Sequence, residues 1–195
     1  MANLVAGYNT AGAGASALAQ WSNPGNVTAE DGVYAQSISG GTPWSGTRKM
    51  EATQFGFAIP ANATIVGFRI RIKGKQNSGI ADTGNTVKVG LTKDGTALAG
   101  SYDSDFAFTT TNTAYERSDG STETNLFGTT WTPAEVNAST FGVLIVAISD
   151  GSATIADQVD VVQVKVFYTL TASVTSGSWK AYPGLAVSPN NKGRY

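Results

Sequence analysis

The chain has 195 residues, of which 41% are hydrophobic and 14% charged, and its formal net charge at pH 7 is −1. It contains no cysteine and no histidine, which excludes disulfide bonds, Cys/His zinc sites and Ser-His-Asp or Cys-His catalysis. No apolar run reaches the roughly 18 residues of a transmembrane helix, and a near-neutral chain has no overall field that attracts DNA or a membrane. Soluble domains usually carry about 25% charged residues, so we expect neighbouring proteins to cover part of this surface.

The first segment, residues 1–20, is rich in alanine and glycine and carries no charged side chain. This composition is typical of a flexible arm that needs a contact to become ordered. The segment lacks the basic start and compact apolar centre of a secretory signal, so we expect synthesis in a cytoplasm without export by that route.

The next segment, residues 21–75, is predicted to form turns and strands. Asn23-Pro24-Gly25 and Asp31-Gly32 predict turns. In FGFAIPANATIVGFRIRIKGK, residues 55–75, the proline at position 60 is expected to end one strand, because proline has no N–H for the ladder. A second strand is expected to follow.

Strict alternation marks that second strand. Phe68, Ile70 and Ile72 are predicted to face the core. Four of the thirteen basic residues share the other face: Arg69, Arg71, Lys73 and Lys75. This basic stripe is either a solvated sheet face that discourages edge pairing or a docking site for an acidic neighbour. Nucleic-acid binding would call for more charge and for interleaved aromatic residues.

Further strands are predicted between residues 86 and 169. Val87, Val89 and Leu91 alternate with polar or small residues, and Asp94-Gly95 predicts a turn. Residues 141–149 are apolar on both faces, which favours a central strand. In residues 159–169, one face holds Val162, Val164, Val166 and Tyr168, and the other holds Gln163, Lys165 and Phe167. One short helix is expected at residues 131–137, with Thr132 as N-cap, Pro133 at its first position and Glu135 completing a capping box.

The last segment, residues 171–195, predicts a second arm. It carries three basic residues and no acid. We expect it to anchor the protein on an acidic partner through its charges and aromatic side chains. Its candidate docking residues are Trp179, Lys180, Tyr182, Lys192 and Arg194.

Candidate catalytic and metal-binding groups are few. Asp103 and Asp105 would share one face of a strand, an arrangement that could bind Ca²⁺ or serve a glycosidase, but Asp-Gly pairs and isolated carboxylates are more typical of turns. No phosphate-binding loop occurs. We therefore expect no enzyme activity, no cofactor and no catalytic or metal residues.

Short strands separated by turn residues predict an all-β fold, an antiparallel β-sandwich or jelly roll with extended N- and C-terminal arms. The expected domain spans residues 21–170. We expect the large aromatic side chains to serve core or inter-sheet packing: Trp21, Tyr34, Phe55, Phe57 and Trp131.

Four sequence segments together resemble a group of small β-sandwich virion proteins of tailed bacteriophages and prophages. The segments are WSNPGNVTAEDGVYAQ, residues 55–75, LFGTTWTPAEVNASTFGVLIVAI and VDVVQVKVFYT. The resemblance covers residues 21–170 and implies a structural role. The implied function is that of a capsid decoration or cement protein on the virion surface. Its partners would be the major capsid protein and copies of itself, as a homotrimer, and neither nucleic acid nor a membrane.

A different class of function remains open, namely a tail-fibre or tail-tip module that binds a host glycan. This hypothesis predicts an exposed aromatic residue in a loop cleft beside Asp or Asn. The candidates are Trp44, Tyr102 and Tyr115, and the loops to inspect are residues 39–49 and 114–125.

Overall fold

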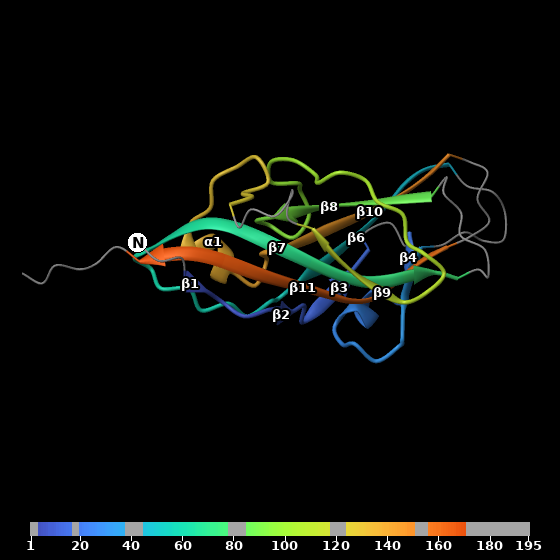
Figure 1. Cartoon of the computed structure of the whole chain (residues 1–195), viewed down its shortest axis with the longest axis horizontal. Helices are drawn as coiled ribbons and strands as arrows, with labels where there is room; N and C mark the ends of the chain where they lie inside the picture. The colour runs from blue at the N-terminus through green and yellow to red at the C-terminus, as the bar shows by residue number, and fades with distance from the viewer. Residues whose placement is uncertain are drawn as a thin grey trace, which may run out of the picture.

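Two antiparallel sheets pack face to face in this computed structural model, which describes residues 4–16, 20–37, 45–77, 85–117, 124–150 and 156–170. The larger sheet has the strand order β4-β5-β11-β7-β9, and β1 and β2 also pair with β11. The smaller sheet has the order β3-β6-β10-β8. Figure 1 shows the two layers, with β7 and β11 as the longest ribbons. The predicted all-β sandwich is therefore confirmed.

The bounds of the elements are as follows. The larger sheet comprises β1 (Leu4–Val5), β2 (Asn9–Thr10), β4 (Trp21–Ser22), β5 (Ala35–Ser37), β7 (Ala63–Gln76), β9 (Thr113–Arg117) and β11 (Asp157–Leu170). The smaller sheet comprises β3 (Ala13–Ala15), β6 (Ser45–Thr53), β8 (Asn85–Thr92) and β10 (Gly142–Asp150). Two short helices, η1 (Pro24–Val27) and α1 (Pro133–Asn137), complete the described elements.

The alternation of apolar and polar residues sets which side of each strand faces the core. On β7, Phe68, Ile70 and Ile72 are fully buried, as predicted, and the basic residues between them are partly exposed. On β8, the side chains of Val87, Val89 and Leu91 are fully buried. β10 lies between β6 and β8, as its continuous apolar run predicts.

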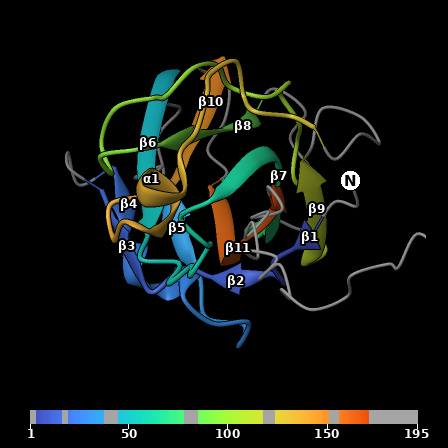
Figure 2. The same ribbon diagram turned by 90° about the vertical axis from the view of Figure 1, so that its left-hand side faces the viewer.

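The N-terminal residues 4–15 are ordered by the sandwich itself. β1 and β2 pair with β11 in one sheet, and β3 pairs with β6 in the other, so this segment crosses from one layer to the other. Figure 2 shows it along the side of the sandwich. An alanine- and glycine-rich arm needs contacts to become ordered, and here the sheets of the domain itself provide them. The arm at residues 171–195 lies outside the described residues.

An aromatic cluster fills one end of the core. The ring of Phe141, which is fully buried, lies 5.5–6.0 Å from four other rings, centroid to centroid. These rings belong to Phe55, Phe57, Phe68 and Trp131. Trp21 is also buried, so the predicted packing role of these aromatic residues is confirmed, whereas Tyr34 is only partly buried.

One strand prediction was wrong. Residues 55–59 are not a strand that Pro60 ends, because β6 already stops at Thr53. Gln54 and Gly56 have left-handed backbones, with φ of 62° and 66°, and such residues cannot continue a ladder. Phe55, Phe57 and Ile59 are nevertheless buried, so the alternation reflects packing without sheet pairing. Pro60 accepts a hydrogen bond from the N–H of Ala63 and so forms the turn into β7.

The helix α1 forms as predicted at the end of the sandwich that faces the viewer in Figure 2. The Thr132 hydroxyl accepts a hydrogen bond from the N–H of Glu135, and the Glu135 carboxylate accepts one from the N–H of Thr132. The same carboxylate pairs with Lys93 Nζ at 2.8 Å. Among the described residues, no helix has the length and hydropathy needed to span a membrane.

The capping box predicts a small acid dependence of stability. The hydrogen bond from Lys93 lowers the pKa of Glu135 below its usual value of 4.5. A lowered folded-state pKa contributes stability above the unfolded value, which is lost as the pH falls through the folded value. Glu135→Gln should therefore lower the free energy of unfolding at pH 7 by less than about 1 kcal/mol, because the pair is partly solvated. Below about pH 4 the difference from the unsubstituted chain should shrink, as measured by denaturation across pH. A constant difference at every pH would contradict this account.

Candidate functional site

A polar hollow of about 140 Å³ lies where two loops meet beside the edge of the smaller sheet. Its walls come from residues 101–104, in the connection after β8, and from Asn125 and Phe127, in the connection before α1. Ligand pockets that enclose a drug-sized molecule measure about 300–1,000 Å³. This hollow is large enough for one ring or one chain end.

The first wall is fixed by backbone pairing with β8. The N–H of Ala99 donates to the Leu91 carbonyl, and the N–H of Asp103 donates to the Val89 carbonyl, each at 2.8 Å. Phe106 and Val87 exchange two further hydrogen bonds, which form an isolated antiparallel bridge between this connection and β8. The connection therefore covers the edge of β8 along its length without becoming a regular strand. The extended strand considered for Asp103 and Asp105 is not formed.

Tyr102 packs on the sheet beneath this wall. A Cβ atom added at Gly90 would lie 2.4 Å from Cδ1 of Leu98 and 3.0 Å from Cδ1 of Tyr102, so the glycine lets both side chains pack closely on β8. The ammonium of Lys88 lies 5.0 Å from the centre of the ring, at a cation–π distance. Burial raises the pKa of the Tyr102 phenol, so its hydroxyl stays protonated at neutral pH and can both donate and accept.

The second wall is held in an unusual backbone conformation. Phe127 is buried and has a φ of 55°, in the left-handed region that non-glycine residues rarely adopt. Its N–H donates to Asn125 Oδ1 at 2.7 Å, and its carbonyl accepts from the N–H of Ser101 at 2.8 Å. The carbonyl of Asn125 accepts from the N–H of Phe68 on β7. These contacts connect the hollow to both sheets.

The hollow presents polar groups suited to a hydroxyl-rich ligand. Among the described residues, the Tyr102 hydroxyl, the Asn125 Nδ2 and the Ser101 hydroxyl make no hydrogen bond. The Asp103 carboxylate accepts one from the N–H of Ser104 at 2.8 Å. Together these groups offer donors and acceptors around a small opening.

The structure places the three aromatic candidates differently. Tyr102 lies in the wall of the hollow beside Asp103, and the 114–125 loop supplies Asn125. Tyr115, on β9, packs against Phe106 and Phe108, and its hydroxyl accepts from the N–H of Thr109. Trp44 lies outside the described residues.

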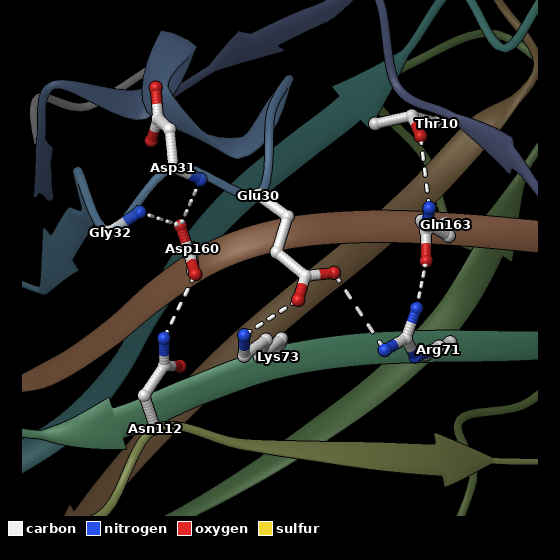
Figure 3. A network of polar contacts seen from close by, with 9 residues as sticks. All are labelled: Thr10, Glu30, Asp31, Gly32, Arg71, Lys73, Asn112, Asp160 and Gln163. Atoms are coloured by element: carbon white, nitrogen blue, oxygen red, sulfur yellow. Dashed lines mark hydrogen bonds and ion pairs between the residues drawn. The ribbon is translucent and has the colours of Figure 1, made fainter.

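The basic stripe is partly neutralised within the chain, as Figure 3 shows. The Glu30 carboxylate lies 2.6 Å from Lys73 Nζ and 3.7 Å from Arg71 Nη2. Arg71 Nη1 also donates to Gln163 Oε1. The hydrogen bond with Glu30 raises the pKa of Lys73 above its usual value. Arg69 lies over the ring of Phe167, 5.8 Å from its centre.

A buried carboxylate, that of Asp160, positions the loop that carries Glu30. Asp160 is 1% exposed and occupies a bulge between Val159 and Val161 of β11. Its Oδ1 accepts from the N–H groups of Asp31 and Gly32, and its Oδ2 accepts from Asn112 Nδ2 (Figure 3). Asp160 is a single acidic residue among valines, but its burial cannot be predicted from the alternation of this strand, because the bulge changes the direction of its side chain.

The remaining candidates from the sequence are the acidic side chains, as metal ligands, and the docking residues of the C-terminal segment. Within the part of the chain that the structure describes, no three Asp or Glu side chains cluster as metal ligands would. The predicted docking residues Trp179, Lys180, Tyr182, Lys192 and Arg194 lie outside that part.

Comparisons with known proteins give a distant likeness of structure only. No protein-family model matches the chain, and no curated protein sequence matches it significantly. The C-terminal domain of a chitobiase from Bacteroides fragilis has a TM-score of 0.43 and 12% identity, over 87% of this chain and 95% of that one. TmCBM61, solved in complex with β-1,4-galactotriose, has a TM-score of 0.37 and 9% identity, over 77% of this chain and 85% of that one. Scores this low carry no argument for a shared function, and neither protein is described as a virion component.

Proposed function

We propose that this β-sandwich is a non-catalytic glycan-binding module and that the hollow at residues 101–104, 125 and 127 is its sugar site. The observation that supports this most is the position of Tyr102. It is an aromatic residue in the wall of a loop hollow beside an aspartate and an asparagine, as the glycan hypothesis predicts from sequence, although it is partly buried and not fully exposed.

The chemistry of the walls suits one sugar ring. A sugar presents hydroxyl groups around an apolar ring, so a site needs several donors and acceptors and an aromatic surface. Asp103 accepts from hydroxyls, Asn125 Nδ2 donates to them, and the protonated Tyr102 hydroxyl can do either. The limited volume favours recognition of a terminal residue or one unit of a chain.

The proposal predicts which substitutions abolish binding. Asp103→Ala and Asn125→Ala should each weaken binding of a matching oligosaccharide about tenfold or more, because each removes a hydrogen-bonding group from a confined site. The matched control is Asp105→Ala, since Asp105 is exposed and lies two residues from Asp103 but does not line the hollow. Isothermal titration with β-1,4-galactotriose, and with whichever oligosaccharide a glycan array identifies, would measure the affinities.

Two results would contradict the sugar site. One is an equal loss of affinity with Asp105→Ala and Asp103→Ala. The other is the absence of any glycan that binds the unsubstituted chain.

The capsid decoration role remains a prediction from the sequence. Of its expected docking residues, Arg71 and Lys73 pair with Glu30 inside the chain, and those of the 171–195 arm lie outside the described residues. Copy number per virion would test this role. Hundreds of copies on a phage head would favour decoration, whereas a few copies at a tail would favour glycan recognition.

A further inference from the structure

Three side chains of the hollow carry hydrogen-bond donors that have no acceptor among the described residues. They are the Nδ2 amide of Asn125 and the hydroxyls of Ser101 and Tyr102. The two hydroxyls can also accept, but the Nδ2 amide can only donate. Burial raises the pKa of the Tyr102 phenol, so this hydroxyl keeps its proton at neutral pH and can donate it to a ligand.

The acceptors in the walls of the hollow already receive hydrogen bonds from within the chain. The carbonyl of Phe127 accepts from the N–H of Ser101 at 2.8 Å, and the carbonyl of Asn125 accepts from a backbone N–H of β7 at 2.9 Å. The Asp103 carboxylate accepts from the N–H of Ser104 at 2.8 Å. The hollow therefore offers a ligand more unused donors than unused acceptors, which favours a ligand group that accepts.

The orientation of the Asn125 amide is fixed by the backbone. The N–H of Phe127 donates to Asn125 Oδ1 at 2.7 Å, and an N–H group cannot donate to the other end of the amide, which is itself a donor. The backbone that makes this bond is also constrained, because Phe127 has a φ of 55°. Asn125 therefore presents a donor, and not an acceptor, to a ligand in the hollow.

Two glycines with left-handed backbones bring the donors of the two loops together. Gly100 has a φ of 91°, and a Cβ atom added there would collide with the carbonyl oxygen of Phe127. Gly128 has a φ of 75°, and a Cβ atom added there would lie 3.0 Å from the hydroxyl oxygen of Ser101. A larger residue at either position would strain the backbone and push the loops apart. The glycines therefore hold Ser101 and Asn125 at the same small hollow.

We propose that the hollow binds the acetamido group of an N-acetylated amino sugar, whose carbonyl oxygen accepts from Asn125 Nδ2 and from the hydroxyl of Ser101 or Tyr102. This inference rests on the proposed function, that the hollow is a sugar site. A carbonyl oxygen accepts and never donates, so it matches a surplus of donors, whereas a sugar hydroxyl also brings a proton that needs an acceptor.

An anionic acceptor fits the hollow less well. A ligand carboxylate would also accept from the three donors, but Asp103 lines the same wall, and two carboxylates in one small site disfavour each other's charge. The acetamido group is neutral and avoids this repulsion. Its own N–H remains available to water or to the Asp103 carboxylate, since a carboxylate can accept more than one hydrogen bond.

Pairs of sugars that differ only at carbon 2 test this proposal on the unsubstituted chain. One pair is tri-N-acetylchitotriose and cellotriose, and the other is N-acetylgalactosamine and galactose. In isothermal titrations, at least one acetamido sugar should bind about tenfold or more tightly than its hydroxyl counterpart, because its carbonyl uses donors that otherwise lose their water without replacement.

Asn125→Asp tests the role of the donor. The substituted carboxylate can still accept from the N–H of Phe127, but it replaces the donating Nδ2 with an acceptor, so the preference for the acetamido sugar should be lost. The matched control is Asn77→Asp. Asn77 is exposed, its Oδ1 also accepts from a backbone N–H, that of Ala156, and it does not line the hollow. This control should leave both affinities unchanged, and urea denaturation would show that each variant folds.

The outcomes separate this inference from the proposed function. If neither acetamido sugar is preferred, but another glycan binds and requires Asp103 or Asn125, the inference is overturned and the sugar site stands. If the preference persists in a folded Asn125→Asp chain, or if oligogalacturonate binds the hollow more tightly than the acetamido sugars, the inference is likewise overturned. If no glycan binds the chain, both fail. Should Asn125→Asp not fold, the sugar pairs on the unsubstituted chain still decide.

Discussion

Phe141→Ala is expected to lower the free energy of unfolding by about 3–5 kcal/mol. Phe141 is fully buried and contacts four aromatic rings that come from the 54–60 segment, from β7 and from the residue before the N-cap of α1. Truncation removes a large apolar surface and leaves a cavity that rigid neighbouring rings cannot readily fill. The cluster holds segments that no β-sheet hydrogen bonds join to one another. Its loss should therefore affect the whole sandwich.

Urea denaturation followed by tryptophan fluorescence would measure this loss. Val33→Ala is the control, since Val33 is 51% exposed and its truncation should change stability by less than about 0.5 kcal/mol. A loss below about 1 kcal/mol for Phe141→Ala would show that the ring cluster is not a principal source of stability.

Asp160→Ala is expected to lower the free energy of unfolding by about 3 kcal/mol or more. The buried carboxylate accepts three hydrogen bonds, and hydrogen bonds to charged groups contribute about 1.5–3 kcal/mol each, without being additive. Asp160→Asn should cost less, because its carbonyl oxygen can still accept from Asp31 and Gly32. Its amide would, however, face the donating amide of Asn112.

This substitution also tests how the loop that carries Glu30 is held. Asp160 holds the loop that places Glu30 over Arg71 and Lys73. Chemical denaturation of the alanine and asparagine variants would give the order of their stabilities. Equal stability of all three chains would mean that the loop is held by other contacts.

Much of the fold was predictable, because a strand that buries one face has apolar residues at every second position. The alternation in β7 and β11 specified which residues face the core, and the Thr132–Glu135 spacing specified the capped helix. The end of β6 was not predictable in this way. The alternation of apolar residues continues past the strand, through the buried Phe55, Phe57 and Ile59. The left-handed backbone at Gln54 has nevertheless already ended β6.

The candidate site was predictable only in part. Tyr102 stands out as an aromatic residue among turn residues, but its partner Asn125 comes from a loop 23 positions away by residue number. Only tertiary contacts, such as that between Ser101 and Phe127, bring the two loops together. The basic stripe was evident, but its neutralisation by Glu30 depends on a bulge at Asp160 that no local pattern reveals.

The most direct test of the central claim is a titration of the isotope-labelled chain with an oligosaccharide that binds it, followed by backbone amide NMR. The account predicts saturable shifts for residues 101–104, 125 and 127, with Asp105 and the residues of β7 little changed for a neutral sugar. Shifts confined to other surfaces, or no saturable shift with any glycan, would contradict the claim that this hollow is a sugar site.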